Sequence, residues 1–220
     1  MATSDKPAAG AEPVSELTTQ RLSLYLRCLD QLAATGVPRV SSKELAASCR
    51  LNPAQIRRDL SSFGAFGVRG VGYSVEDLRR RLREIMGLHR QHRVAIIGMG
   101  NLGRALADYG GFRRGPFQIV ALFDNDPSKV GLRFRMGADV QDVRTLPEVA
   151  RREGIDIAIV AVPADAGCDV AEALAQSGIR AVLNFTPALL ELPPGLKVTN
   201  VDVSVLLESL AFFLANDAHD

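Results

Sequence analysis

A glycine-rich turn follows a short apolar run at residues 94–103, where the sequence is Val-Ala-Ile-Ile-Gly-Met-Gly-Asn-Leu-Gly. Its glycines, Gly98, Gly100 and Gly103, have the spacing G-x-G-x-x-G. This spacing lets a pyrophosphate sit against bare backbone at the N-terminus of the next helix. The motif alone has low specificity, so its neighbours in the chain must decide what it binds.

Asp124 stands at the carboxyl end of a second apolar run, residues 118–123. An acid at this place in a dinucleotide-binding unit accepts hydrogen bonds from the adenosine ribose hydroxyls, and it repels a 2′-phosphate. No arginine directly follows Asp124. The sequence therefore predicts NADH and NAD+ as cofactors in preference to their 2′-phosphorylated forms.

Three further strands are expected at residues 155–162, 179–183 and 197–201. Predicted helices at 145–153 and 165–177 precede the first and the second of these strands. Continuous apolar runs of this kind are typical of a buried parallel sheet. The carboxyl ends of parallel strands meet along one edge of the sheet. The residues at these ends are expected to line the ligand cleft, namely Gly98, Asp124, Pro163 and Asn184.

Two short helices joined by a tight turn are predicted at residues 41–49 and 53–63, because Ser41 and Asn52 are good N-cap residues. One side of the second helix is apolar. Its other side presents Gln55, Arg57, Arg58, Ser61 and Ser62. This arrangement matches a helix-turn-helix, in which arginine, glutamine and serine contact base edges or phosphates. An ordinary amphipathic helix with solvated arginines fits the second helix alone equally well.

The segment 64–73, directly after this helix, contains four glycines around Arg69. Such a density of glycine indicates tight turns. A short hairpin after a recognition helix is the wing of a winged helix, and Arg69 at its tip would enter a minor groove or contact a phosphate. A flexible linker is the alternative, but linkers do not usually contain residues such as Val68, Val71 and Tyr73.

Charge is unevenly distributed along the chain, although the net charge is only +1. Residues 1–92 contain 14 Lys and Arg against 9 Asp and Glu, a balance of +5. Residues 93–220 contain 12 against 16, a balance of −4. The basic half predicts a polyanion partner, while a solvated arginine-rich surface would give the same count.

The last predicted helix, at about residues 204–216, is apolar on almost every side, and Glu208 is its only charge before the end. A helix of this kind must be buried, either within its own subunit or against a second copy. Our hypothesis is that it mediates a homodimer, with Phe212 and Phe213 at the interface.

Composition favours a cytoplasmic globular protein. Hydrophobic residues make up 47% and charged residues 23%, and no apolar run approaches the ~20 residues of a membrane span. Residues 1–14 are expected to form a disordered tail rather than a signal peptide. Cys28, Cys49 and Cys168 lack metal-ligand spacing, so no metal is expected, and reduced thiols are favoured over a thiol redox sensor.

Several of these motifs, in the same order, resemble the Rex family of redox-sensing repressors. The similar segments are 55–64 (Gln-Ile-Arg-Arg-Asp-Leu-Ser-Ser-Phe-Gly), 67–73, 98–103, 123–127, 184–187 and 200–202, so the resemblance extends over roughly residues 16–216. It implies a winged-helix homodimer that binds palindromic operators of respiratory and fermentative genes. It also implies that NADH releases the DNA, that NAD+ competes with NADH, and that subunits exchange their C-terminal helices.

The resemblance also assigns roles by position. Arg57, Arg58 and Arg69 match the principal DNA contacts, and Arg58 stands where the family commonly has lysine, whose geometry differs. The family has residues tied to the NADH-dependent switch at the domain and subunit interfaces. In this chain they are matched by Arg27, Tyr109 and Asp202. Reduced nicotinamide is uncharged, so an apolar pocket would favour NADH, and Tyr109 is the expected lever for this discrimination.

Two other functions are alternatives. An NAD-dependent dehydrogenase needs a proton-transfer group and a substrate domain. The three histidines, His89, His92 and His219, are expected to lie exposed in a link or a tail, and no segment is long enough for a substrate domain. A nucleotide- or CoA-binding module without a DNA role would need neither the recognition helix nor the wing.

The sequence thus predicts an α/β chain that is a regulator and not an enzyme. Its expected parts are a tail (1–14), a winged helix-turn-helix domain (15–88), a Rossmann-like doubly wound parallel-sheet domain (89–202) and a swapped dimerisation helix with a tail (203–220). The expected cofactor residues are Gly98, Met99, Gly100, Asn101, Leu102, Gly103, Tyr109, Asp124, Pro163 and Asn184. The expected DNA contacts are Ser42, Gln55, Arg57, Arg58, Ser61, Arg69 and Gly70, and the expected switch and interface residues are Arg27, Tyr109, Asp202, Phe212 and Phe213.

Overall fold

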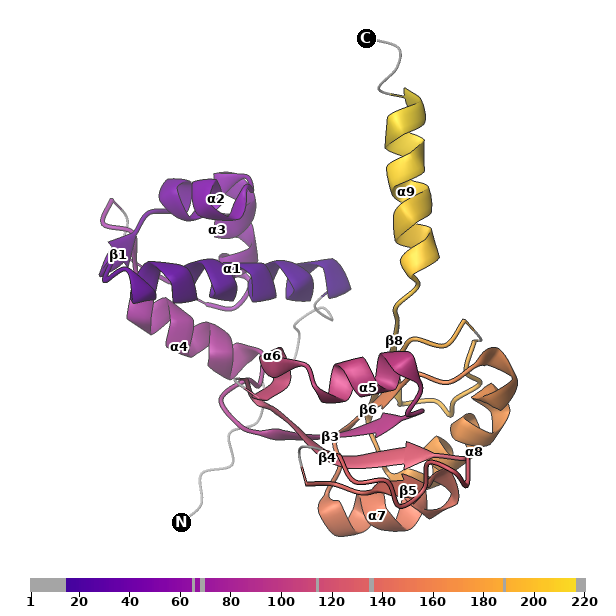
Figure 1. Ribbon diagram of the computed structural model, residues 1–220. Helices are drawn as coiled ribbons and strands as arrows, with labels where there is room; N and C mark the ends of the chain where they lie inside the picture. The colour runs from indigo at the N-terminus through magenta and orange to yellow at the C-terminus, as the bar shows by residue number, and fades with distance from the viewer. Residues whose placement is uncertain are drawn as a thin grey trace, which may run out of the picture. The chain divides into compact units, whose positions relative to one another are not determined.

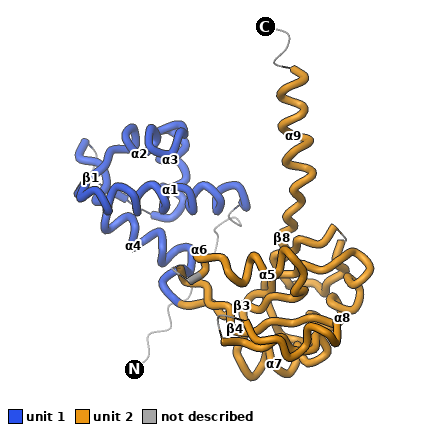
Figure 2. Tube along the Cα trace, viewed as in Figure 1, with its two compact units in different colours: residues 1–90 blue, residues 91–220 orange. Residues whose placement is uncertain are grey.

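A computed structural model describes residues 15–64, 66–67, 70–113, 115–134, 137–187 and 189–216 of the chain (Figure 1). The chain divides into two units, of which the first ends at Arg90 and the second begins at Gln91 (Figure 2). The predicted tail 1–14, the predicted wing-tip residue Arg69 and residues 217–220 lie outside the described residues.

N-cap residues set the helix starts of the first unit. The expected capping box is present, because Ser41 Oγ accepts the N–H of Glu44 at 3.1 Å and Glu44 Oε2 accepts the N–H of Ser41 at 2.7 Å. Asn52 Oδ1 accepts the N–H of Ala54 at 2.8 Å and so caps the next helix. The helices described in this unit are α1 (Glu16–Ala34), α2 (Ser42–Cys49), α3 (Pro53–Ser61) and α4 (Val75–Ile85).

A short antiparallel ribbon joins the end of the predicted wing to the chain before α2. It consists of β1 (Arg39–Val40) and β2 (Tyr73–Ser74), with Val40 opposite Tyr73. Gly72 has φ +80°, and a Cβ at this position would lie 2.6 Å from the carbonyl oxygen of Val40. Glycine is therefore required here for the two segments to approach.

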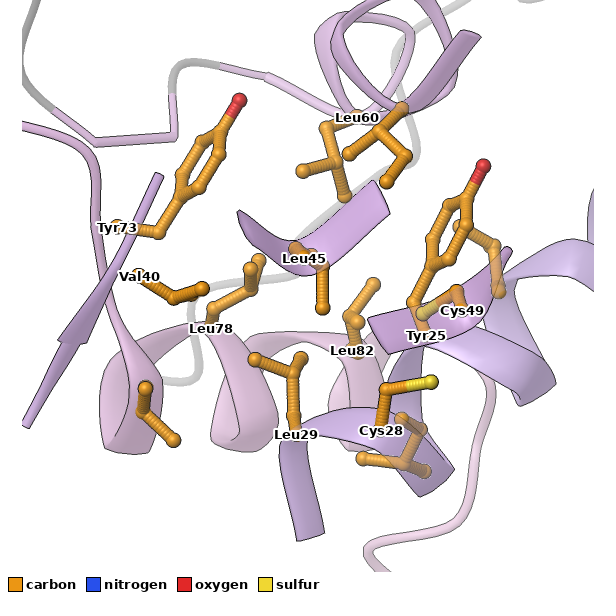
Figure 3. Close-up of a cluster of buried hydrophobic side chains, with 14 of the residues drawn as sticks. Tyr25, Cys28, Leu29, Val40, Leu45, Cys49, Leu60, Tyr73, Leu78 and Leu82 are labelled. Carbon is orange, nitrogen blue, oxygen red and sulfur yellow. The ribbon is translucent and has the colours of Figure 1, made fainter. Parts of the chain in front are cut away.

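The core of the first unit lies between α1, α2 and α4 (Figure 3). Leu29 of α1, Leu45 of α2 and Leu82 of α4 meet there and are fully buried. Leu60 of α3 joins the same cluster, which fixes the apolar side of α3 against the core. The polar side of α3 consequently faces outward, as the residue pattern predicted.

Six parallel strands form the sheet of the second unit, in the order β5-β4-β3-β6-β7-β8. They are β3 (His92–Ile97), β4 (Phe117–Asp124), β5 (Val140–Asp142), β6 (Ile157–Val160), β7 (Ala181–Asn184) and β8 (Lys197–Asn200). The order runs outward from β3 on one side and from β6 on the other, which confirms the predicted doubly wound sheet. Such sheets bind ligands at the carboxyl ends of the strands where the order reverses, here between β3 and β6.

Both faces of this sheet are covered, which explains why its strands are continuously apolar. Alternate residues of β3 belong to different clusters: Val94 and Ile96 pack with Ala107 of α5, and Ile97 packs with Leu146 of α7. The helices of this unit up to residue 177 are α5 (Asn101–Ala107), α6 (Gly110–Arg113), α7 (Leu146–Glu153) and α8 (Gly167–Ser177), with 3-10 turns at Val143–Thr145 and Ala164–Ala166.

His92 is not an exposed linker residue, so that expectation was wrong. It is the first residue of β3, and its N–H donates to the carbonyl oxygen of Pro116 at 2.7 Å. Its ring stacks on that of Phe117, with 5.8 Å between centroids. The strand therefore begins earlier than the apolar run, because pairing with β4 recruits a histidine that hydrophobicity alone does not mark.

The last helix, α9 (Val203–Asn216), follows β8 and leaves all its residues exposed. The exposed fraction is 66% for Phe212 and 75% for Leu214. The sequence allowed this helix to be buried either within its own subunit or against a second copy. In the described part of the chain, its own subunit does not bury it.

Candidate nucleotide pocket and nucleic-acid interface

A pocket of about 250 Å³ opens at the carboxyl ends of β3, β4 and β6, where the strand order reverses. Four of the predicted cofactor residues line it together, namely Gly98, Gly100, Asp124 and Pro163. Apolar side chains of Val143, Val162 and Val170 form much of the remaining wall. The pocket thus occupies the place where doubly wound sheets bind dinucleotides.

The three glycines of the motif have three different roles. A Cβ on Gly98, whose φ is +95°, would lie 2.5 Å from the carbonyl oxygen of Ala161 in the neighbouring strand's extension. A Cβ on Gly103 would collide with the carbonyl oxygen of Gly98, so this glycine lets α5 pack against the turn. Gly100 has open space on its Cβ side and lines the pocket. A side chain there would enter the pocket rather than clash with the protein.

Asp124 joins the end of β4 to the glycine turn. Its side chain is 5% exposed, Oδ2 accepts the N–H of Met99 at 2.7 Å, and Oδ1 accepts the N–H of Asp126 at 2.9 Å. Burial raises the pKa of Asp124, but these two hydrogen bonds and the ammonium of Lys129 outweigh it, so that the pKa lies below its ordinary value. The carboxylate of Asp124 at the pocket is therefore ionised.

Lys129 is a pocket residue that sequence reasoning missed. Its Nζ lies 3.1 Å from Oδ2 of Asp124 and 3.6 Å from Oδ2 of Asp126. The signal that could have found it is the spacing of Asp126 and Lys129, three residues apart in a tight turn after a strand.

Other predicted cofactor residues do not line the described pocket. Met99 is fully buried in the core between α5 and the sheet, whereas Leu102 and Asn101 are exposed on α5. Asn184 is 1% exposed, and its side chain is bound to Asn200 at 2.8 Å and to the N–H of Thr186 at 3.0 Å. This asparagine holds the ends of β7 and β8 together.

The residues assigned to the switch and the interface are exposed. Tyr109 is 58% exposed and packs edge-on against Phe112, with 5.2 Å between ring centroids. Asp202 accepts the N–H of Ser204 at 2.8 Å at the start of α9, and Arg27 faces solvent on α1. Arg27 belongs to the first unit and the other two to the second. Phe212 and Phe213 are exposed on α9.

A groove of about 510 Å³ on the first unit collects several predicted DNA contacts. Its walls are the start of α2, the side of α3 and the described part of residues 66–73, and they include Ser42, Arg57 and Gly70. Arg57 donates from Nη1 to Ser42 Oγ at 3.0 Å across this groove. Arg58 and Ser61 are exposed on α3 outside it. The structure therefore gathers arginine, hydroxyl and glycine backbone groups on one outward side of the unit.

Asp59 of α3 is a second polar residue that sequence reasoning missed. It is 5% exposed and lies under the outward side of the helix, where Arg21 and Tyr25 of α1 bind its carboxylate. Burial raises the pKa of Asp59, but hydrogen bonds from Arg21, Tyr25 and Gln55 outweigh it, so that the pKa falls below its ordinary value. An ion pair thus ties α3 to α1.

Comparison with known proteins joins these two units in one family. Residues 13–61 match the family model described as "Putative DNA-binding protein N-terminus", and residues 89–188 match the model described as "CoA binding domain". The chain is 43% identical to the redox-sensing transcriptional repressor Rex of Desulfitobacterium hafniense, over 90% of this chain and 94% of the relative. It is 42% identical to Rex of Streptomyces coelicolor, over 94% of this chain and 80% of the relative. The chain belongs to the Rex family.

Solved structures of a Rex-family repressor called RSP have the same fold as this Rex-family chain. RSP in complex with β-NAD+ and operator DNA is 37% identical, with a TM-score of 0.88 over 94% of this chain and 95% of RSP. RSP in complex with β-NADH is 36% identical, with a TM-score of 0.83 over 94% of this chain and 97% of RSP. These matches confirm the predicted fold class, a DNA-binding domain followed by a Rossmann-like domain.

The comparisons also bear on the alternatives to a regulator. Relatives that match most of the chain are named transcriptional repressors and not dehydrogenases. The CoA-binding description applies to the second unit alone and leaves the first unit unexplained. In the part of the chain that the structure describes, no cluster of metal ligands is found, and no helix is long and apolar enough to cross a membrane.

Proposed function

We propose that this protein is a transcriptional repressor that binds palindromic operator DNA and releases it when NADH occupies the pocket of the second unit. The observation that carries the proposal is the match of nearly the whole chain to RSP, which was solved with β-NAD+ and operator DNA and also with β-NADH. A nucleotide pocket and an outward basic helix stand in one chain, as a sensor of this kind requires.

The pocket supports the choice of cofactor. Gly100 leaves room for a pyrophosphate, and Asp124 offers a carboxylate to the ribose. Asp126 adds a second negative charge that disfavours a 2′-phosphate. NADH can act as a release signal only if it binds the DNA-incompetent arrangement more tightly than the competent one. An apolar wall favours the uncharged reduced ring, and we assign the readout to Tyr109 together with Arg27 and Asp202.

The first unit supports the DNA role. Arg57, Ser42 and Gly70 line one groove, and Arg58 and Ser61 stand beside it on α3. We infer that α3 enters a major groove while the start of α2 and the segment containing Arg69 contact the backbone. Residues 15–88 are in this proposal the DNA-reading domain and residues 89–202 the sensor.

A homodimer is part of the proposal. A palindromic operator mirrors a two-fold symmetric protein, whose recognition helices read half-sites about one helical turn, or a multiple of one, apart. The exposed apolar residues of α9 supply a surface that a second copy would bury. Residues 203–220 then form the dimerisation segment, and the dimer acts in the cytoplasm, without a metal and without a membrane.

Fluorescence anisotropy tests the proposal directly. A duplex enriched by the wild-type protein from a random-sequence pool serves as the operator, hereafter the selected operator. We expect tight binding at fixed salt that micromolar NADH reverses and that NAD+ and NADPH do not reverse. Binding that ignores all three nucleotides would contradict the sensor role, and failure to enrich any sequence would contradict the DNA role.

A further inference from the structure

The recognition helix α3 contains one buried acid, and its carboxylate accepts four hydrogen bonds. Asp59 Oδ2 accepts from Arg21 Nε at 2.6 Å and from the hydroxyl of Tyr25 at 2.7 Å. Asp59 Oδ1 accepts from Arg21 Nη2 at 2.9 Å and from Gln55 Nε2 at 2.7 Å. Figure 3 shows the Tyr25 hydroxyl at the edge of the apolar cluster rather than inside it. Three of the four donors come from α1, and the fourth belongs to the residue one turn earlier on α3.

The fourth hydrogen bond fixes which way the Gln55 amide points. An ionised carboxylate has only acceptor atoms, so the group of Gln55 that faces it must be the amide nitrogen. The opposite orientation would place Oε1 against Oδ1 of Asp59 and bury two acceptors together. Arg21 binds both carboxylate oxygens of Asp59 from the other side, so the carboxylate cannot turn away.

The fixed amide presents a defined edge to the outside. Nε2 carries two hydrogens, of which Asp59 takes one, and Oε1 is left as an acceptor. Among the described residues, Asp59 is the hydrogen-bond partner of the Gln55 side chain. One donor beside one acceptor is the pattern that pairs with N7 and the N6 amino group of adenine in the major groove.

We propose that Asp59 is a positioning residue that makes Gln55 selective for adenine. The inference rests on the proposed DNA role of α3 and adds what sets its base preference. A free glutamine rotates its amide and tolerates several base edges. A glutamine held by a buried carboxylate keeps its amide donor and its amide acceptor in fixed positions. Asp59 itself touches no DNA in this scheme.

Four variants separate positioning from simple stability. Gln55→Leu removes the reading group, and Asp59→Asn removes the acceptor-only partner, since an asparagine at this place accepts either polarity of the Gln55 amide. Tyr25→Phe is the matched control, because it deletes one hydrogen bond to Asp59 without touching Gln55. Gln55→Glu leaves Asp59 unchanged. Asp59 repels the new carboxylate, which turns outward and offers only acceptor atoms. These suit the N4 amino group of cytosine.

The measurement is the affinity of each variant for the selected operator and for all its single-base changes, by anisotropy at fixed salt. In the wild type we expect one A·T pair per half-site whose replacement weakens binding about 5- to 150-fold, the range of a bidentate contact. Gln55→Leu and Asp59→Asn should both flatten the profile at that pair and leave other positions unchanged. Tyr25→Phe should keep the wild-type profile, and Gln55→Glu should favour cytosine there.

The outcomes are distinguishable. If the wild type enriches no sequence, the proposed function fails, and this inference fails with it. If it enriches an operator but Asp59→Asn keeps the wild-type profile, the positioning role is overturned while the proposed function stands. If Asp59→Asn does not fold, Gln55→Glu tests the contact on which the inference depends: an unchanged profile overturns the inference, and a shift toward cytosine at one pair supports its first step, that residue 55 reads a base.

Discussion

The Nζ of Lys129 lies 3.1 Å from Oδ2 of Asp124, a side chain that is only 5% exposed. The same nitrogen lies 3.6 Å from Oδ2 of Asp126. The ammonium of Lys129 therefore pairs with the carboxylates of both Asp124 and Asp126 at the rim of the candidate nucleotide pocket. Burial of Asp124 is tolerated because this ammonium and two backbone N–H groups satisfy it.

Lys129→Met should therefore destabilise the second unit. Removing one partner of a buried hydrogen-bonded charge costs roughly 1–3 kcal/mol of unfolding free energy. Urea unfolding of the variant and the wild type at neutral pH measures the difference. Lys197→Met, which removes an exposed lysine of β8, is the control and should change stability by less than about 0.5 kcal/mol. Equal stability of Lys129→Met and the wild type would contradict the role given to this ion pair.

Gly100→Ala and Gly103→Ala should fail in different ways. Gly100 has a φ of −76° and open space beside it, so alanine fits the backbone but enters the pocket. We expect an unchanged melting temperature, NADH binding weakened at least about tenfold, and DNA that NADH no longer releases. Gly103→Ala should instead lower the melting temperature, because its Cβ meets the Gly98 carbonyl. Calorimetry of unfolding and of NADH binding tests both, and normal NADH affinity in Gly100→Ala would argue against the pocket.

Acid should destabilise the protein through Asp59 and Asp124. Both have pKa values lowered on folding, so the unfolded chain binds protons more tightly than the folded one. Their stabilisation is fully present above the unfolded aspartate pKa of about 3.9, and it is lost as the pH falls through the folded values. Urea titrations from roughly pH 6 to pH 2 should show a shallower loss in Asp124→Asn than in the wild type. The exposed Asp165→Asn is the control, and equal slopes in all three proteins would refute the assignment.

Charged substitutions on α9 should dissociate the proposed dimer. Leu210→Glu combined with Phe213→Glu places two carboxylates on an apolar surface, and an interface cannot bury them unpaired. Sedimentation equilibrium should report half the wild-type mass, and affinity for the selected operator should fall because a monomer reads one half-site. Glu208→Gln, on the same helix, should remain dimeric. A dimeric double variant would mean that the subunits associate elsewhere.

Arg57→Ala should weaken DNA binding without changing sequence preference. Arg57 lines the groove beside Ser42 at the start of α2, a place suited to a phosphate contact. The slope of log affinity against log salt should decrease by about 1, and all operator variants should lose affinity alike. Arg151→Ala, in α7 of the other unit, should behave as the wild type. A changed base preference would show instead that Arg57 contacts a base.

Local signals in the sequence were sufficient for most element boundaries. Ser41, Glu44 and Asn52 predict helix starts because a cap depends on residues within one turn, and the structure places their side chains on the expected N–H groups. The glycine motif likewise predicts a turn whose steric demands are local. By contrast, β5 has three residues and α6 has four, too few for a recognisable period.

Partnerships between distant segments could not be predicted in the same way. Asp59 and Arg21 are 38 residues apart, and nothing near either residue marks the pair. Met99 stands inside the glycine motif and was expected at the cofactor, yet its side chain is buried beside Ala107. Motif membership fixes where the backbone goes, but packing decides which side chains reach the pocket. Residue roles at the nucleotide and at the DNA therefore stay predictions.

In the proposed dimer, the exposed apolar helix α9 would tie operator occupancy to the amount of protein in the cell. With every residue of α9 in water, a newly synthesised subunit displays a surface of the kind that chaperones and proteases bind until a second copy covers it. Pairing of two identical subunits rises with the square of their concentration when they are scarce. Operator occupancy should then respond steeply to synthesis rate at low abundance and level off once most subunits are paired.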